Sequence, residues 1–395
     1  MIQIHPITGE ITFAYAMTLS DTYYVLRKNA SIDVAADYAL YEQAGVSNNR
    51  VIIKGSVTGS DDGLDAGIGL DGKNSEVWVA KTGLVHAAIG IEMGAFDQKV
   101  TNYGRIEGAD SGIWAQSNGT IRNFGQIFAK EDGIITGGIH PVDIFNGKDG
   151  RIVADNVAVH LNGSYGISST LTNEGVIKGG AWAFASAFGD EKVINHGVMK
   201  GLIHMGEGND IFDNRGGKVD HEIYGQKGND TLITDSAKVH LQEDAGMGID
   251  SVKSTVSYAL SENVENLVLM GKADIKGTGN DGDNVLTGNK GDNRLSGLAG
   301  FDILKGAGGN DILTGGADGD VFLFTKRGGH DVITDFVGGE DLVDLAGQKI
   351  IVDYDDLIKN HITSSHGDLV IHMGNDTLTL RDIALADLDD KYFSF

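Results

Sequence analysis

The stretch GNDGDNVLT GNKGDNRLS GLAGFDILK GAGGNDILT GGADGDVFL, residues 279–323, divides into five consecutive nonapeptides with no residue left over. Each nonapeptide begins with glycine. The sixth position always holds Asn or Asp: Asn284, Asn293, Asp302, Asp311 and Asp320. The eighth position is always large and apolar: Leu286, Leu295, Leu304, Leu313 and Phe322. A period this strict indicates a repeat architecture, in which each unit buries its apolar side chain by stacking on its neighbours.

Each nonapeptide suits one half of a flattened coil. Six residues make a turn and three make a short strand, so two nonapeptides close one coil. Glycine supplies the positive φ angles that tight turns need. Because side chains alternate across a strand, the sixth side chain points into the turn and the eighth points between two sheets. This geometry predicts that Asn284, Asp302 and Asp320 share one edge, and that Asn293 and Asp311 share the other.

The turns offer the ligands that calcium prefers. Ca²⁺ takes six to eight oxygen atoms in a tolerant geometry, and turn carbonyls plus a carboxylate supply them from two successive coils. Gly300 and Gly309 are the turn glycines expected to contribute. We expect the strongest site between Asp302 and Asp320, because both are charged. Pairs that include an asparagine carry less charge and should bind more weakly.

Three isolated nonapeptides of the same type precede the array: MGEGNDIFD at 205–213, GQKGNDTLI at 225–233 and AGMGIDSVK at 245–253. Their sixth positions are 20 residues apart, which predicts one such turn per coil, stacked along one edge. The metal ligands and turn glycines expected here are Asp210, Asp230, Asp250, Gly206, Gly208 and Gly228.

A second repeat occupies residues 100–201: VTNYGRIEG, IRNFGQIFA, IFNGKDGRIVA, LTNEGVIKG and VINHGVMKG. Its marker asparagines are Asn102, Asn123, Asn146, Asn173 and Asn195. A period just above twenty residues, with β-branched residues between Asn-x-Gly turns, favours a right-handed parallel β-helix. Each marker asparagine should then hydrogen-bond to the next in a ladder. The alternative is a β-sandwich with hairpin turns.

The composition excludes several classes of protein. A formal net charge of -25 and a pI near 4.7 argue against binding to nucleic acid or to anionic membranes. No cysteine is present, so a disulfide framework is excluded. No apolar run is long enough to span a membrane. The N-terminal MIQIHPITGEITFAYAM lacks the features of a secretory signal peptide.

These patterns predict four segments. Residues 1–204 form a β-helix region with rungs of about 22 residues, and 205–255 form rungs that carry single calcium turns. Residues 256–323 contain a linking strand and the nonapeptide roll. Residues 324–395 form a C-terminal cap, in which Asp331 is expected to complete a last calcium turn. The terminal KYFSF is either a secretion signal or a capping strand.

The part of the chain from residue 205 onward resembles the calcium-binding half of RTX proteins, which bacterial type I systems export. The resemblance implies an all-β fold, in which a parallel β-helix runs into a C-terminal parallel β-roll, and it implies Ca²⁺ as the bound ion. Two departures from the family pattern are Asn at two sixth positions and loss of the second glycine in most copies. The sixth-position residues to which the calcium role carries over are Asp210, Asp230, Asp250, Asp302, Asp311 and Asp320, with Asn284 and Asn293 as weaker members.

The resemblance also implies a C-terminal secretion signal and an extracellular location without an N-terminal signal peptide. The expected partners are calcium ions and the type I secretion machinery, with an acidic polysaccharide or a cell surface as a further candidate. In the cytosol, where calcium is scarce, mutually repelling carboxylates should keep the Gly-rich chain unfolded. Outside the cell, the free energy of calcium binding becomes free energy of folding.

No catalytic residue and no organic cofactor site is predicted, because the H-E-x-x-H and G-x-S-x-G motifs are absent. A non-catalytic surface, matrix or adhesion component is therefore favoured. One alternative is an enzyme acting on acidic polysaccharide, since β-helices resemble polysaccharide lyases, glycanases and epimerases; another is an exported toxin-like effector. The residues that an enzyme would use are Arg105, Trp114, Arg122, Lys130, Glu131, Asp132 and Trp182.

Overall fold

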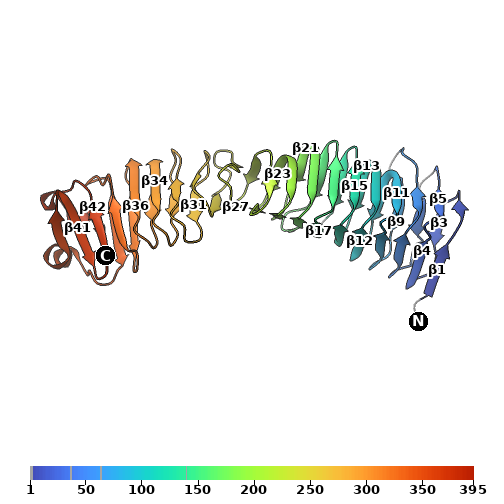
Figure 1. The fold of residues 1–395 in the computed structure, drawn as a ribbon, viewed down its shortest axis with the longest axis horizontal. Coiled ribbons are helices and arrows are strands. Elements are labelled where there is room, and N and C mark those ends of the chain that lie inside the picture. Colours follow the sequence, from blue (N-terminus) through green and yellow to red (C-terminus); the bar gives the residue numbers. More distant parts are fainter. Residues whose placement is uncertain (1–2, 36–37, 63–64, 139) are drawn as a thin grey trace. The chain divides into compact units, whose positions relative to one another are not determined.

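The computed structural model describes residues 3–35, 38–62, 65–138 and 140–395 (Figure 1). The chain forms two compact units, residues 1–228 and 229–395. In each unit, short strands pair in parallel with the strand one coil further along the chain. Each unit is therefore part of an all-β parallel solenoid, which confirms the predicted fold class. The alternative of a β-sandwich with hairpin turns is wrong for this repeat, because the pairing is parallel.

The first unit contains two sheets. The strands of its first sheet are β1 (Gln3–Ile7), β4 (Thr22–Leu26), β7 (Arg50–Ile53), β10 (Glu76–Val79), β12 (Gln98–Asn102), β14 (Gly119–Asn123), β17 (Val142–Asn146), β20 (Thr170–Asn173), β22 (Lys192–Asn195) and β24 (Ile211–Asp213). The strands of its second sheet are β2 (Glu10–Ile11), β3 (Tyr15–Met17), β5 (Ser31–Asp33), β6 (Leu40–Glu42), β8 (Ser56–Thr58), β9 (Ala66–Leu70), β11 (Leu84–Met93), β13 (Arg105–Ala115), β15 (Gln126–Ala129), β16 (Asp132–Gly137), β18 (Arg151–Ala154), β19 (Val157–Asn162), β21 (Val176–Ser186), β23 (Val198–Glu207), β25 (Lys218–Val219) and β26 (Ile223–Lys227).

The core of the first unit is built by stacking similar apolar side chains. Burial alternates along the strands, as in β12, so every second side chain points inward. The register places Ile106, Ile127, Ile152 and Ile177 on successive coils, and all four are fully buried. Branched side chains of equal size fill each layer without voids, which is why the same residue recurs at this position.

The marker asparagines form the predicted ladder. Each side-chain amide donates to the carbonyl oxygen of the next asparagine at 2.8 Å, from Asn102 to Asn195, and all five residues are completely buried. The ladder continues to Asn214, where the distance is 2.7 Å. The same oxygen can also accept from the glycine two residues later, as Asn102 does from Gly104. The ladder prediction is therefore confirmed.

The second unit again has two main sheets. Its first sheet contains β27 (Thr231–Thr234), β29 (Ser251–Ser254), β31 (Asn266–Leu269), β33 (Val285–Thr287), β35 (Ile303–Lys305), β37 (Val321–Thr325), β39 (Leu342–Gly347) and β43 (Phe393–Ser394). Its second sheet contains β30 (Tyr258–Ala259), β32 (Lys276–Thr278), β34 (Arg294–Ala299), β36 (Ile312–Ala317), β38 (His330–Ile333), β42 (Asp376–Leu380), β41 (Asp368–Met373) and β40 (Ile362–Ser365). The short β28 (Leu241–Gln242) also lies in this unit. The eighth-position side chains lie between the sheets with at most 2% exposure.

The C-terminal segment closes the second unit. Strands β40, β41 and β42 pair antiparallel, which ends the parallel pattern. The helical segments here are α1 (Tyr354–Asp356), a π-helical turn (Leu357–His361) and two 3-10 turns (Leu385–Asp387 and Asp390–Tyr392). None of the described helices is long and apolar enough to cross a membrane. Strand β43 of the terminal KYFSF pairs with β39, and Phe393 is 6% exposed, so this segment is part of the folded end of the second unit. Its role as a secretion signal stays a prediction.

The asparagine ladder yields a stability prediction. The Asn146→Ala substitution removes the two buried amide hydrogen bonds that join Asn146 to Asn123 and Asn173, and it leaves each partner with one hydrogen bond fewer in a buried site. We expect the free energy of unfolding to fall by about 2–5 kcal/mol, because each unsatisfied buried group costs about 1–3 kcal/mol. Urea denaturation in saturating calcium measures this loss. The control is Asn118→Ala, which breaks solvent-exposed bonds to Asp97 and should cost less than about 1 kcal/mol. Equal losses in both variants would contradict a structural role for the ladder.

Candidate metal centre

The sixth-position side chains of the nonapeptides stack along two edges of the second unit. On the first edge, the backbone N–H of Asn284 donates to Asp302 Oδ1 at 2.8 Å, and that of Asp302 donates to Asp320 Oδ1 at 3.0 Å. On the second edge, the N–H of Asn293 donates to Asp311 Oδ1 at 2.7 Å. The two edges therefore contain the residues that the spacing assigns to them.

One carboxylate oxygen is left over at each of the aspartates Asp302, Asp311 and Asp320. These side chains are at most 1% exposed, and their Oδ2 atoms are buried without a hydrogen-bond donor among the described residues. The space for this oxygen exists because the first residue of each repeat is glycine. A Cβ on Gly297, Gly306 or Gly315 would lie closer than 3.0 Å to the corresponding Oδ2, a distance that real Cβ atoms do not show.

In the absence of a cation, burial favours the neutral, protonated form of these carboxyl groups. Burial, with the neighbouring Asp320 and Asp283, raises the pKa of Asp302 to about 7. Burial likewise raises the pKa values of Asp311 and Asp320 to about 6 each. A buried negative charge without a partner is unfavourable, and a divalent cation would compensate it. The donor set contains only hard oxygen atoms, which suits Ca²⁺. The residues of these turns thus fit a bound calcium ion.

The turn backbone is the same whether or not the second glycine is present. Gly300 and Gly309, at the fourth position, adopt φ angles of 99° and 117°. At the second position, Gly316 has φ 123°, and Leu298 and Ala307 also lie in the left-handed region with φ 96° and 78°. A left-handed conformation costs a non-glycine residue about 1–2 kcal/mol. The surrounding turn therefore enforces this conformation against the local preference of Leu298 and Ala307.

The two asparagine turns are built differently. Asn284 Nδ2 donates to Val264 O and to Asn280 Oδ1, each at 3.1 Å. Asn293 Nδ2 donates in the same way to Ala273 O at 3.4 Å and to Asn289 Oδ1 at 3.2 Å, and it also donates to Ile275 O at 3.3 Å. Within 279–284 and 288–293, which the structure describes in full, no residue has a left-handed backbone. Amide hydrogens thus satisfy the turn oxygens here, and weaker metal binding at these positions stays a prediction.

The isolated nonapeptide turns lie partly in each unit. Gly206, Gly208 and Gly228 adopt φ angles of 99°, 145° and 131° in the first unit, the conformation expected for the RTX turn. Asp210, also in the first unit, is 1% exposed and accepts from the backbone N–H of Glu191 at 2.6 Å.

In the second unit, the backbone N–H of Asp230 donates to Asp250 Oδ1 at 2.7 Å, and that of Asp250 donates to Glu265 Oε2 at 2.7 Å. One carboxylate oxygen from each of Asp230, Glu243 and Asp250 can be chosen so that the three lie within 4.8 Å of one another. Glu243 and Glu265 were not predicted from the sequence. They lie outside the sixth position of any nonapeptide, and the signal that could have found Glu265 is its register with Asp250, one residue before paired strands.

The aspartate stacks continue into the cap. Asp331 Oδ1 accepts from the N–H of Asp311 at 2.9 Å, and burial raises the pKa of Asp331 to about 7. Asp335 Oδ1 accepts from Gly315 at 3.0 Å. Asp341, which the sequence did not reveal, accepts from Asp320 at one oxygen and from Val337 at the other, each at 2.8 Å. Because both of its oxygens have donors, Asp341 ends the first stack as a hydrogen-bonded cap.

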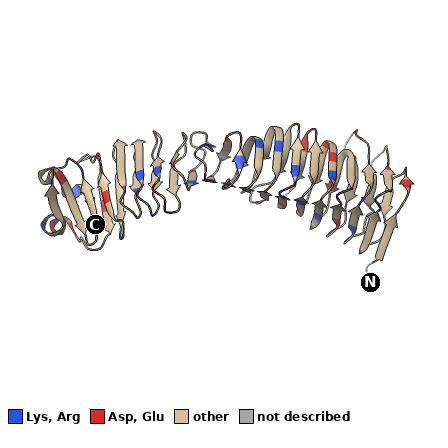
Figure 2. Cartoon of the chain, in the orientation of Figure 1, with Lys and Arg blue, Asp and Glu red and all other residues tan. Residues whose placement is uncertain are grey.

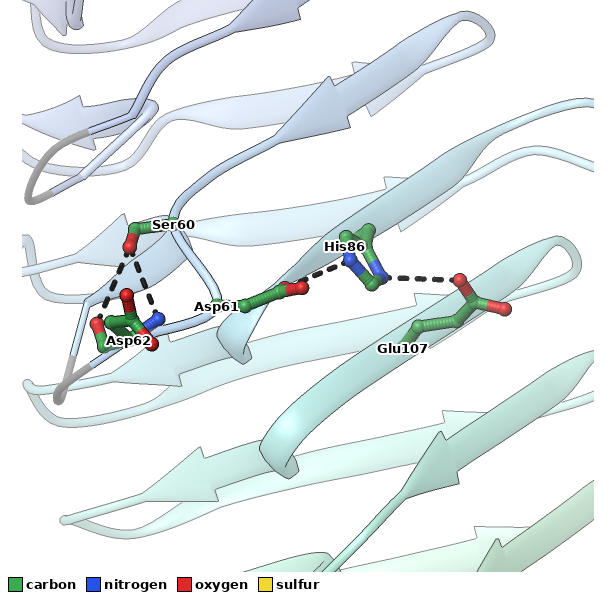
Figure 3. Close-up of polar contacts among 5 residues, drawn as sticks. All are labelled: Ser60, Asp61, Asp62, His86 and Glu107. Carbon is green, nitrogen blue, oxygen red and sulfur yellow. Dashed lines mark hydrogen bonds and ion pairs between the residues drawn. The ribbon is translucent and has the colours of Figure 1, made fainter.

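A separate cluster of titratable side chains lies in the first unit (Figure 3). His86 Nε2 lies 2.9 Å from Asp61 Oδ1, and its Nδ1 lies 3.2 Å from Glu107 Oε2. Ser60 is not part of a nucleophile–histidine pair, because its Oγ is engaged with the backbone of Asp62 (Figure 3). The cluster bridges neighbouring coils, because β11, which carries His86, pairs in parallel with β13, which carries Glu107.

The residues considered for a polysaccharide enzyme are engaged with neighbours or dispersed. Arg105 pairs with Glu107 and lies 4.6 Å from the centre of the Phe128 ring. Asp132 Oδ1 lies 3.3 Å from His160 Nδ1. Glu131 accepts a hydrogen bond from Asn156, and Trp182 packs edge-on against His204. Trp114 is paired in register with Glu92 and Ile135. Arg122 on β14 and Lys130 after β15 are exposed.

Comparison with known proteins agrees with the geometry of the roll. The family model of the RTX calcium-binding nonapeptide repeat, which comprises four copies, matches residues 278–313 and 287–322. No curated protein matches this chain. Among solved structures, the extracellular lipase LipA from Serratia marcescens is similar with a TM-score of 0.22 and 19% identity, over 65% of this chain and 40% of that chain. This chain contains RTX calcium-binding nonapeptide repeats, as the resemblance of its sequence predicts.

Proposed function

We propose that this protein is a secreted calcium-binding RTX protein whose second unit folds when calcium binds after type I export. The observation that carries the proposal is the set of buried, donor-free Oδ2 atoms of Asp302, Asp311 and Asp320. Side chains so placed need a cation, and the repeat to which they belong is a calcium-binding one. Calcium is scarce in the cytosol and abundant outside the cell, so export would couple to folding.

Folding and binding are linked through the charge of the turns. Asp302 and Asp320 lie on adjacent coils, joined by the hydrogen bond from the Asp302 N–H to Asp320 Oδ1. Without a cation, their ionised side chains lose hydration and repel each other. Bound calcium would neutralise them and tie successive coils together, so its binding free energy would stabilise the folded state by mass action. The residues that would hold it are these aspartates and Asp311, with glycine-rich turn backbone around them.

The first unit depends less on metal through most of its length. Its coils are joined by the neutral asparagine ladder and by stacked isoleucines, neither of which carries charge. We infer that this unit presents a stable surface and acts in adhesion, a matrix or a surface layer without catalysis. Its surface also carries basic residues on successive strands (Figure 2), among them Lys178 and Lys200, which are adjacent in register. Such a pair suits an anionic partner, for which an acidic polysaccharide is the candidate.

Glycine substitution in a single turn tests the calcium site. Gly306→Ala places a methyl group on Asp311 Oδ2, whereas Gly308→Ala in the same turn meets nothing closer than 3.5 Å. Neither glycine has a positive φ, so alanine imposes no backbone strain at either position. We expect Gly306→Ala to weaken calcium-induced folding at least tenfold in calcium concentration, and Gly308→Ala to change it less than twofold. Circular dichroism during calcium titration measures both variants.

The outcome separates the calcium mechanism from general packing. If calcium leaves the circular dichroism of the wild-type chain unchanged after chelator treatment, calcium-driven folding is refuted. If Gly306→Ala and Gly308→Ala shift the titration equally, the glycine cradle has no special role at the metal.

The raised pKa values predict an unusual pH dependence. In the calcium-free fold, the carboxyl groups of Asp302 and Asp311 have pKa values of about 7 and about 6, against 3.8 ordinarily. The folded state then binds more protons than the unfolded state between these values, so stability falls as pH rises from about 4 to about 7. Calcium requires the ionised form, so its stabilising effect should grow over the same interval.

Melting temperatures in chelator and in saturating calcium, at about pH 5 and about pH 8, measure this dependence. We expect a lower calcium-free Tm at the higher pH and a larger gain from calcium there. The triple variant Asp302→Asn, Asp311→Asn, Asp320→Asn lacks the three carboxyl groups with raised pKa values. Its calcium-free Tm should therefore fall less between the two pH values. A calcium-free Tm that rises between the two pH values would contradict the assignment.

The non-catalytic role is tested on substrates. The calcium-loaded protein is incubated with a panel of acidic polysaccharides, and new reducing or unsaturated ends are measured. We expect no new ends with any of them. Release of ends that disappears in Asp132→Asn would instead establish a glycan-cleaving enzyme.

A further inference from the structure

One position of the coil links the two kinds of repeat. This position is distinct from the asparagine ladder. In the first unit, it is the residue that lies at the start of, or directly before, each register-paired strand of the first sheet. Its occupants on successive coils are Thr22, Asn49, Ser75, Gln98, Gly119, Val142, Ser169, Glu191 and Asp210. Up to Ser169 these residues are neutral. Glu191 is the first carboxylate in the series.

The same hydrogen bond recurs at this position. The N–H of Thr22 donates to Asn49 Oδ1 at 3.1 Å, and the N–H of Val142 donates to Ser169 Oγ at 3.1 Å. Glu191 donates in the same way to Asp210 Oδ1 at 2.6 Å. The nonapeptide turns of the second unit use this bond between their sixth positions. Glu191 therefore occupies the place of a sixth-position aspartate, although its sequence does not fit the nonapeptide.

The surroundings of Glu191 reproduce those of the calcium turns. Glu191 is 2% exposed, and its Oε2 is buried without a hydrogen-bond donor. Gly189, two residues earlier, has φ 123°, close to the 117° of Gly309 at the same place in its turn. A Cβ on Gly189 would lie 2.6 Å from Glu191 Oε1, so glycine again makes room for the carboxylate.

The next coil approaches closely. Gly208 has φ 145°, and a Cβ on it would overlap the carbonyl oxygen of Gly189. The turns at 187–191 and 206–210 therefore lie in close contact at Gly189 and Gly208, and the backbone N–H of Glu191 reaches the Asp210 carboxylate between them. None of the ion pairs of the described residues involves Glu191, so no Lys, Arg or His compensates its charge.

We propose that Glu191 and Asp210 bind a calcium ion in the first unit, one coil before the first turn that the nonapeptide pattern identifies. The site has the hard oxygen donors that a divalent cation of this size takes. A glutamate replaces the usual aspartate, so neither the repeat pattern nor the family match includes it. The inference rests on the proposed function only in taking calcium as the ion.

The test uses the full-length chain and the Glu191→Gln variant, which keeps the size of the side chain and removes its charge. The matched control is Glu174→Gln, at an exposed glutamate of the same unit. Native mass spectrometry counts bound calcium ions, and hydrogen exchange follows the amides of residues 187–211 and of 297–322 with and without calcium. A third variant, Glu191→Asp, introduces the usual sixth-position residue.

We expect Glu191→Gln to bind one calcium ion fewer than the wild type and the control. Calcium should no longer slow amide exchange over 187–211 in this variant, while its effect over 297–322 is retained. In chelator, Glu191→Gln should be at least as stable as the wild type, because an uncompensated buried charge is gone. Glu191→Asp should restore both the stoichiometry and the protection.

Two results would overturn the inference and leave the proposed function intact. One is an unchanged calcium count in Glu191→Gln with unchanged protection over 187–211. The other is calcium protection over 297–322 alone in the wild type, which would mean that Glu191 shares a proton with Asp210 instead of a cation. A wild-type chain that binds no calcium would refute the proposed function as well.

Discussion

One type of hydrogen bond recurs in both units: a backbone N–H at the turn donates to the side-chain oxygen at the same position of the next coil. It joins Thr22 to Asn49 in the first unit and Asp302 to Asp320 in the second. The bond fixes one oxygen of the acceptor and orients the rest of the group. When the acceptor is a hydroxyl or an amide, the turn is complete. When it is the carboxylate of Asp302, Asp311 or Asp320, a second oxygen remains, buried and without a donor among the described residues.

Under the proposed function, the metal dependence of a coil would therefore be decided by a single side chain. The strands, the core layers and the N–H donor are the same on either side of the change, because parallel stacking repeats them. Only the charge at the turn differs. Asn284 and Asn293 show the consequence within the nonapeptides themselves, since their amide hydrogens donate to the oxygens of the turn.

The sequence predicted those features that a period encodes. The asparagine ladder, the two aspartate edges and the buried eighth positions all follow from spacing, because equal steps along the chain become neighbours in a solenoid. Glu243, Glu265, Asp341 and Glu191 escaped prediction, since they reach the stacks from coils whose lengths or turn residues depart from the period. The hydrogen bonds that order the asparagine turns also escaped prediction. They involve Asn280 and Asn289, whose amides donate to backbone carbonyls of the preceding coil that are brought near only by folding.

The asparagine turns also bear on how the second unit would assemble. They lie at the start of the five nonapeptides, and hydrogen bonds from their own amide groups order them. Asp302 and Asp311 each stack directly on one of these turns. If calcium drives folding as proposed, the first calcium-binding coil would form against a surface that is already ordered, which would reduce the conformational entropy lost with the first ion. Later ions would then bind to a growing edge, and folding would proceed from these turns toward the cap at Asp341.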